Sequence, residues 1–215
     1  AEVIKVEWRK GADLRNSGPF VGDMSVQFAA YNRGKKSITL NTRHPKGKEM
    51  FLDLVRVSDV VLENFRPGTM EQMGFSYEEM CKVNKGIILA SVSGFGQYGP
   101  YSERVGFDSI GQALGGLMSL TGSINDPPIR TFFPLIDRIT ALHATIGALA
   151  AIHEREISGK GQTIDVCLAD TGFTVNEIPI SSYLGDGTIQ QKEGKGSGIS
   201  NSYQTSDGWV YMNAN

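Results

Sequence analysis

Short apolar runs along the chain predict strands. Residues 3–7 alternate between apolar and charged side chains, as a half-buried strand does, and residues 38–40 form a second short apolar run. Residues 59–63 and 86–92 are nearly continuous in valine, isoleucine and leucine, which is typical of strands buried within a parallel sheet.

Segments with helical spacing separate these runs. Residues 45–57 place their apolar side chains on one face and their charges on the other, and residues 107–120 are also compatible with a helix. Ser76 and Glu79 have capping-box spacing and predict the start of a short helix. Because strands alternate with helices, the sequence predicts an α/β fold with a parallel sheet.

A long helix is predicted over residues 135–158, and its apolar run over residues 135–152 raises the question of a membrane span. Asp137, Arg138 and His143 interrupt it, which favours a core helix buried on most sides. Asp137 is interpreted as a cap or a pocket residue, and His143 and His153 as packed or surface side chains.

Loop signals divide the chain. Residues 9–30 are irregular and carry several glycines, and residues 185–198 are rich in glycine, lysine and serine without periodicity. Residues 206–208 predict a hairpin turn before a strand that starts at Trp209. We therefore expect a large domain over residues 1–184, a linker over 185–200, and the beginning of a smaller α+β domain over 201–215. Both ends look cut, because the chain starts and stops within predicted strands.

Composition narrows the class of protein. Lys and Arg number 21 and Asp and Glu number 23, a net charge of −2 with both signs interspersed, so bulk charge predicts neither a nucleic-acid nor a membrane partner. Cys81 and Cys167 lie in apolar segments and match no metal-ligand spacing, so we expect free thiols and no metal. With no visible signal peptide, a soluble cytoplasmic protein is expected.

Asp170 is the candidate nucleophile. It directly follows segment 163–169, which is apolar and rich in β-branched residues, and the residues after it have helical spacing. Asp170 is therefore expected at the carboxyl end of a strand, in the first turn of a helix. Ligands of open α/β sheets bind at that edge, and the helix dipole favours an ionised carboxylate that can attack an activated carbonyl. The alternative from local sequence is that Asp170 only caps the helix.

Two further segments suggest a ligand site. Arg33, Lys35 and Lys36 precede a predicted strand and suit an anion such as a phosphate, although a solvated basic loop is the alternative. The glycine-rich loop 93–100 permits close approach of a ligand to the backbone. It forms neither a dinucleotide fingerprint nor a Walker loop, which argues against a nicotinamide or ATP enzyme.

Taken together, these motifs resemble the class III CoA-transferases, the family that includes formyl-CoA transferase, carnitine CoA-transferase and the α-methylacyl-CoA racemases. The matching segments follow the family's order over nearly the whole chain: residues 1–7, 32–40, 63–68, 89–96, 106–108 and 161–166. The resemblance implies a Rossmann-like large domain, with the family's first strand and helix preceding Ala1.

The resemblance also implies a function and a site. It implies an acyl-CoA:carboxylate CoA-transferase, a transferase of sulfur-containing groups, in which Asp170 forms covalent intermediates and Asp108 is an active-site acid. Coenzyme A is the implied co-substrate, with an acyl-CoA donor and a small carboxylic-acid acceptor. The implied CoA-binding residues are Arg33, Lys35, Lys36, Arg66, Gly94, Phe95, Gly96 and Arg104.

Two alternatives to a CoA-transferase remain, one an enzyme of the same fold and one a protein without catalytic activity. The racemase branch has a proton-transferring histidine where this chain has Phe107, which disfavours an acyl-CoA racemase or isomerase. A non-catalytic CoA-binding subunit of the same fold is a second alternative. Family members form interlocked homodimers, so we expect a homodimer of the intact protein and no turnover by these 215 residues alone. The sequence does not specify the acyl donor or the acceptor.

Overall fold

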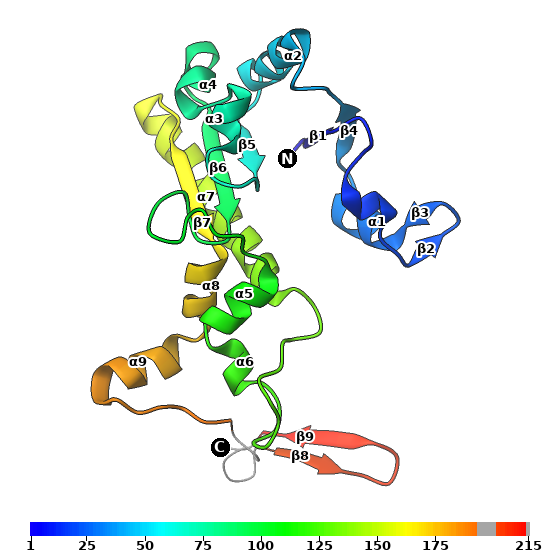
Figure 1. The fold of residues 1–215 in the computed structure, drawn as a ribbon, viewed down its shortest axis with the longest axis vertical. Coiled ribbons are helices and arrows are strands. Elements are labelled where there is room, and N and C mark those ends of the chain that lie inside the picture. Colours follow the sequence, from blue (N-terminus) through cyan, green and yellow to red (C-terminus); the bar gives the residue numbers. More distant parts are fainter. Residues whose placement is uncertain (193–200, 214–215) are drawn as a thin grey trace. The chain divides into compact units, whose positions relative to one another are not determined.

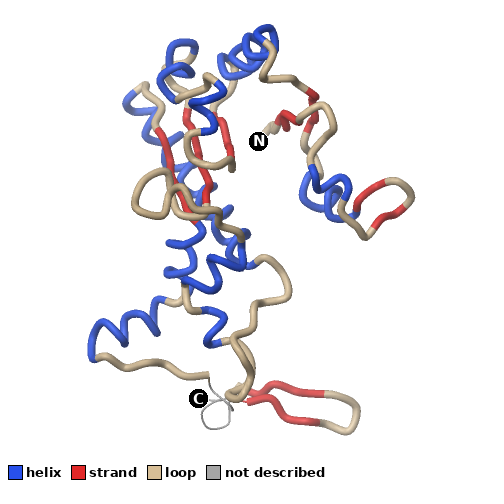
Figure 2. The backbone as a smooth tube through the Cα atoms, viewed as in Figure 1, coloured by secondary structure: helices blue, strands red, loops and turns tan. Residues whose placement is uncertain are grey.

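The computed structural model describes residues 1–192 and 201–213, which form two compact units. The first unit contains residues 1–59 and 70–87, and the second contains residues 60–69 and the chain from residue 88 onward. Figure 1 shows the course of the chain and Figure 2 its helices and strands. The units are described one at a time.

The first unit begins with a parallel pair of strands, β1 (Ile4–Glu7) and β4 (Lys36–Thr39). The segment between them is more regular than the sequence predicted. It contains a 3-10 helix (Asp13–Asn16), the antiparallel pair β2 (Phe20–Val21) and β3 (Met24–Ser25), and helix α1 (Val26–Asn32). The prediction of a long irregular loop over residues 9–30 was therefore wrong, because two-residue strands joined through Gly22 leave no readable period.

The rest of the first unit is helical, with α2 (Pro45–Arg56) and α4 (Tyr77–Val83) in contact and α3 (Thr69–Met73) between them in sequence. Its core includes Val55, Phe75 and Met80, each at most 1% exposed. The predicted helix start at Ser76 is confirmed, since its hydroxyl accepts the backbone N–H of Glu79.

The second unit is built on a three-stranded parallel sheet in the order β5 (Val60–Glu63), β6 (Ile88–Ser93) and β7 (Thr163–Cys167). The central strand β6 is buried along almost its whole length, as its apolar run predicted. Strand β5 lies at an edge of this sheet and Leu62 is 68% exposed, so the prediction of a buried strand was wrong there.

Helices α5 (Asp108–Leu114), α6 (Leu117–Leu120), α7 (Leu135–Ser158), α8 (Leu168–Val175) and α9 (Glu177–Asp186) accompany the sheet. The single helix expected over residues 107–120 is broken at Gly116, whose φ is +79°. Helices α5 and α8 cross with their backbones in close approach at Gly111, Gly115 and Gly172, where a Cβ on Gly172 would lie 2.3 Å from the Gly111 carbonyl oxygen.

Helix α7 has the predicted bounds and contacts β6 and β7, with Gly147 against Ile164. The expectation that it is buried on most sides was wrong. Leu142, Ile146 and Leu149 are each more than 60% exposed, because the described residues cover only the sheet-facing side. By length and composition alone α7 could cross a membrane, a test that core helices also pass. Its packing on the sheet favours a core helix.

The predicted hairpin is confirmed by the antiparallel pair β8 (Asn201–Gln204) and β9 (Trp209–Met212). Helix α9 continues to Asp186, two residues past the expected domain end at 184. Within the segment read as a linker, Lys192 is buried and its ammonium donates to the carbonyls of Asp126 and Pro127 at 2.8 and 2.7 Å. Residues 193–200 of that linker lie outside the described residues.

Candidate active site

Three predicted site segments follow the carboxyl ends of three adjacent strands in the second unit. The strands are parallel and in register, with Glu63 opposite Ser91 and Ser93 opposite Cys167. Arg66 therefore follows β5, the glycine loop follows β6, and Asp170 follows β7, all at one edge of the sheet. This is the edge at which open α/β sheets bind ligands.

Asp170 occupies the third position of α8 and is exposed to solvent. The helix N-cap is Cys167, whose Sγ accepts the Asp170 backbone N–H at 3.4 Å. The alternative that Asp170 itself caps the helix is therefore wrong. Strand β7 ends at Cys167, three residues earlier than the sequence placed its end. The Asp170 carboxylate lies in the first turn, at the positive end of the helix.

The glycine loop is fixed to the same edge by hydrogen bonds from both sides. The N–H of Gly96 donates to the Ser93 hydroxyl at 2.8 Å, and the N–H of Gln97 donates to an Asp165 carboxylate oxygen at 2.7 Å. The N–H of Ala169 donates to the Gly94 carbonyl oxygen at 3.1 Å. The loop and the turn that carries Asp170 are thus directly joined.

Sequence reasoning missed Ser93, Asp165 and Cys167 as residues that organise this site. The available signals were an acid inside the apolar strand 163–167 and a serine before two closely spaced glycines. Neither signal names a partner, since Asp165 and Gln97 are 68 positions apart in the chain.

Phe95 and Arg104, two predicted CoA-binding residues, are brought together through Tyr101. The Phe95 and Tyr101 rings meet edge to face at 5.8 Å between centroids, and the Arg104 guanidinium lies 4.0 Å from the Tyr101 centroid. The loop closes at its far end, where a Cβ on Gly94 would lie 2.6 Å from the Gly106 Cα. Arg66 is exposed in the turn after β5.

Asp108 is buried, and its carboxylate is engaged in the fold. One oxygen accepts the backbone N–H groups of Ile136 and Asp137 at 2.8 and 3.3 Å, and the other accepts the Gln112 amide at 2.6 Å. Helix α7 has Pro134 at its N-cap and no side-chain cap of its own, so Asp108 supplies the cap from α5. The interpretation of Asp137 as this cap was wrong. An additional role of Asp108 as an active-site acid stays a prediction.

Asp137 is the acid in this region whose pKa is raised. Desolvation is the larger cause, and the negative charge of Asp108 adds to it. Phe107, in the position of the racemase histidine, is the N-cap of α5 and is 68% exposed. Its ring has no proton to transfer.

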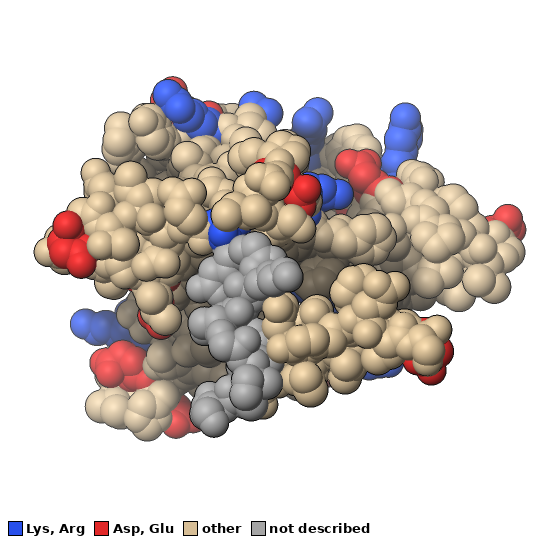
Figure 3. Space-filling model, turned by 90° about the horizontal axis from the view of Figure 1, so that it is seen from below, with Lys and Arg blue, Asp and Glu red and all other residues tan. Residues whose placement is uncertain are grey.

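The basic residues Arg33, Lys35 and Lys36 belong to the first unit and are exposed. The Lys36 ammonium pairs with Glu2, and that of Lys35 donates to Asn32 at 3.4 Å. On the face drawn in Figure 3, side chains of both signs are scattered and do not gather into one patch. The binding of an anion by these three residues stays a prediction.

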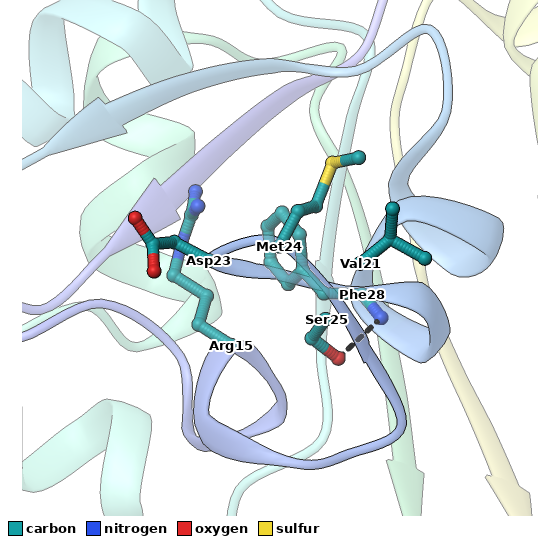
Figure 4. Close-up of a pocket in the computed structure, with 6 residues that line it drawn as sticks. All are labelled: Arg15, Val21, Asp23, Met24, Ser25 and Phe28. Carbon is teal, nitrogen blue, oxygen red and sulfur yellow. Dashed lines mark hydrogen bonds between the residues drawn. The ribbon is translucent and has the colours of Figure 1, made fainter.

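The first unit also contains a pocket of about 340 Å³ between the 3-10 helix, the β2–β3 hairpin and α1 (Figure 4). Its lining residues are Arg15, Val21, Asp23, Met24, Ser25 and Phe28. The Arg15 guanidinium lies 3.9 Å from the Phe28 ring centroid and makes two hydrogen bonds to Glu7, at 2.7 and 2.8 Å. With its cation already paired, the pocket does not have the features of an anion site.

Both cysteines are free, with Cys167 buried and Cys81 half-buried. Burial raises the pKa of the Cys167 thiol to about 11, and the neighbouring Asp170 carboxylate also raises it. A neutral thiol therefore lies beside the candidate nucleophile. Within residues 1–192 and 201–213, no group of three or more His, Cys, Asp or Glu side chains has the arrangement of a metal site.

Comparison with known proteins identifies relatives of the whole chain. It is 41% identical over its full length to a succinyl-CoA–D-citramalate CoA-transferase of Chloroflexus aurantiacus, of which it covers 55%. Over 79% of its length it is 44% identical to an acetyl-CoA:oxalate CoA-transferase of Acetobacter aceti, of which it covers 44%. The chain thus spans about half the length of the curated relatives it matches.

A solved structure shares the fold. A CAIB/BAIF family protein from Brucella suis superposes with a TM-score of 0.90 at 35% identity, over 97% of this chain and 57% of the other. The predicted α/β fold with a parallel sheet and flanking helices is confirmed. The model of CoA-transferase family III matches residues 1–215, and the chain belongs to that family.

Proposed function

We propose that the protein is an acyl-CoA:carboxylate CoA-transferase that works through covalent intermediates on Asp170. One observation carries the proposal: the turn that bears the exposed Asp170 is hydrogen-bonded to the glycine loop, through the Ala169 N–H and the Gly94 carbonyl oxygen. A carboxylate in the first turn of a helix and the backbone of a glycine loop meet at the ligand-binding edge of the sheet.

The reaction follows from a carboxylate acting on a thioester. Asp170 attacks the donor carbonyl, the C–S bond breaks, and a mixed anhydride and CoA thiolate form. The thiolate attacks the aspartyl carbonyl, which releases the donor acid and leaves an aspartyl-CoA thioester. The acceptor carboxylate repeats the two exchanges in reverse order, so that CoA leaves on the acceptor and Asp170 is regenerated.

The chain's own groups favour this sequence of steps. Asp170 needs no general base, because it attacks as an anion. Backbone N–H groups of the glycine loop that remain available at this edge can stabilise the oxyanion of each tetrahedral intermediate. Phe95 and Arg104 present an aromatic face and a cation for the adenine and phosphates of CoA.

The relatives guide the choice of substrates. Their names include succinyl-CoA, acetyl-CoA, citramalate and oxalate, so small carboxylates are proposed as acceptors. We further propose that the protein is a cytoplasmic homodimer. Light scattering during size-exclusion chromatography checks the homodimer, with twice the mass of the encoded chain as the expected result.

Intact-protein mass spectrometry after brief exposure to acyl-CoA donors tests the function. Hydroxylamine or borohydride should give a trapped product that maps to Asp170, and Asp170→Ala should give none while still binding CoA. Binding of CoA without an adduct from any donor would instead favour a binding subunit. Exchange of the α-proton of a chiral acyl-CoA with solvent would favour a racemase.

A further inference from the structure

Two buried hydroxyls join the long helix α7 to the turn that carries Asp170. Thr140 on α7 is 0% exposed and Thr171 on α8 is 1% exposed. Their hydroxyl oxygens lie 3.0 Å apart, within hydrogen-bond distance. Since Thr171 directly follows Asp170, this is a contact between α7 and the candidate nucleophile's own turn.

Each hydroxyl also bonds to its own helix. Thr171 Oγ1 donates to the Cys167 carbonyl at 2.9 Å, and Thr140 Oγ1 lies 2.7 Å from the Ile136 carbonyl. Each hydroxyl has one hydrogen, so while Thr171 donates to the Cys167 carbonyl, Thr140 shares its hydrogen between the Ile136 carbonyl and Thr171 Oγ1. Nδ1 of the half-buried His143 lies 3.5 Å from Thr171 Oγ1 and extends the contact by one turn of α7.

The contact between Thr140 and Thr171 completes a continuous set of contacts that runs from Asp108 to Asp170. Asp108 accepts the N–H of Ile136, and the carbonyl of Ile136 meets Thr140. Thr140 meets Thr171, which bonds to Cys167, and the Cys167 thiol accepts the N–H of Asp170. Every link lies within hydrogen-bond distance, and the two links made by Thr140 share its one hydroxyl hydrogen.

We propose that Thr140 and Thr171 are positioning residues. They keep the first turn of α8, which carries Asp170, in a fixed position relative to the glycine loop, so that Asp170 is placed for nucleophilic attack. The inference rests on the proposed function of Asp170. Neither hydroxyl touches the reacting atoms. They act by fixing the backbone on the Thr171 side of Asp170, while Ala169 fixes the other side through Gly94. Attack on a bound thioester depends steeply on such placement.

Thr171→Val is the primary test, in the protein as its gene encodes it. Valine has nearly the shape of threonine, and Thr140 keeps the Ile136 carbonyl as a partner, so no buried hydroxyl is left without one. We expect kcat to fall about tenfold with KM for the acyl-CoA donor within about twofold, because alignment is lost and binding is not.

Thr171→Ser and Thr145→Val are the matched variants. Serine keeps the hydroxyl and should restore kcat to within about twofold of the original protein. Thr145 is an exposed threonine on α7 with the same kind of bond to its own helix, 2.8 Å to the Ala141 carbonyl, so Thr145→Val should leave kcat unchanged. The double variant Thr140→Val with Thr171→Val should fall no further than Thr171→Val alone, since both remove one contact.

The outcomes distinguish failure of the positioning role of the two threonines from failure of the proposed transferase function. If Asp170→Ala abolishes transfer and Thr171→Val lowers thermal stability with kcat intact, the pair is only structural and the inference is overturned. If serine fails to restore kcat, packing and not the hydroxyl matters, which also overturns it. If Asp170→Ala retains transfer, the proposed function itself fails, whatever Thr171→Val does.

Discussion

At the scale of single residues, Cys167 is the least expected member of the site. A thiol takes the N-cap position usually held by Ser, Thr, Asp or Asn. With a pKa of about 11 in place of the ordinary 9.0, it stays protonated far above neutrality. Alkylation of Cys167 in the native protein should therefore keep rising up to about pH 11, without a plateau near 9.

Site-resolved mass spectrometry with iodoacetamide across pH 7 to 11 measures this directly. Half-buried Cys81 provides an internal comparison in the same digests, and the urea-unfolded protein gives the unperturbed thiol. Native Cys167 that reaches its full alkylation rate by about pH 9 would contradict the burial argument.

Glu7 provides a second prediction for a single residue. It is 4% exposed and accepts two hydrogen bonds from Arg15 and one each from Ser37 and the Ala12 N–H. The Arg15 bonds hold the pKa of Glu7 well below its usual value. The unfolded chain then binds more protons than the folded protein as pH falls below about 4.5, so the contribution of Glu7 is full above that pH and lost beneath it.

Glu7→Gln should lower the free energy of unfolding by about 2 kcal/mol at pH 7, and by progressively less below pH 4.5. Urea titrations at several pH values measure the difference. Asp53→Asn, which removes an exposed ion pair with Arg56, serves as the control and should change stability by less than about 1 kcal/mol. A loss for Glu7→Gln that is the same at pH 7 and at pH 3 would contradict the assignment.

At the scale of elements, the crossing of α5 and α8 depends on glycines. A Cβ on Gly172 would lie 2.3 Å from the carbonyl oxygen of Gly111 in α5 and 3.3 Å from the Cα of Gly115, the C-cap of α5. Backbone atoms cannot move aside as a flexible side chain does. Gly172→Ala should therefore lower the free energy of unfolding by about 2–3 kcal/mol and reduce transfer by displacing the Asp170 turn.

Gly185→Ala is the control for this prediction. Gly185 lies in helix α9, and a Cβ there would meet nothing within 4 Å. Alanine should stabilise that helix by about 0.5–1 kcal/mol, because glycine loses more backbone entropy on folding. Chemical denaturation compares the two variants, and effects of the same sign would contradict the close packing of α5 and α8.

The sequence predicted those elements whose signals are local. Residues 135–158 are one helix from end to end, and the hairpin around residues 206–208 and the helix start at Ser76 are also in place. It did not predict contacts across the chain. Asp108 and Ile136 are 28 positions apart, and neither periodicity nor capping rules join the acid of one helix to the first turn of another.

The same limit applies to the active-site edge. Family resemblance pointed to Asp170 and to the glycine loop, and the parallel register places both at one edge of the sheet. The Ser93, Asp165 and Cys167 contacts that shape this edge depend on how strands pair, which composition does not encode. Local sequence left open whether Asp170 caps α8, and the strand ends at Cys167, three residues earlier than expected, which makes the thiol the cap.

At the scale of the whole molecule, the main question is where α7 lies. Its composition satisfies the requirements of a membrane span, and an apolar stripe through Leu142, Ile146 and Leu149 is open to solvent in the described structure. Its opposite side rests on the sheet, where a Cβ on Gly147 would lie 3.0 Å from the Ile164 Cγ2. If α7 is a core helix packed on the sheet, residue 147 must be small, whereas a membrane span would accept a large apolar side chain there.

Gly147→Leu should lower the free energy of unfolding by about 1–3 kcal/mol, because a larger side chain must displace Ile164 from the sheet. Ala150→Leu places the same side chain at an exposed position of α7 and should change stability little. Denaturation in detergent-free buffer measures both. If the two leucine variants were equally stable, α7 would not rest on the sheet at Gly147, and the fixed placement of Thr140 against the Asp170 turn would lose its support.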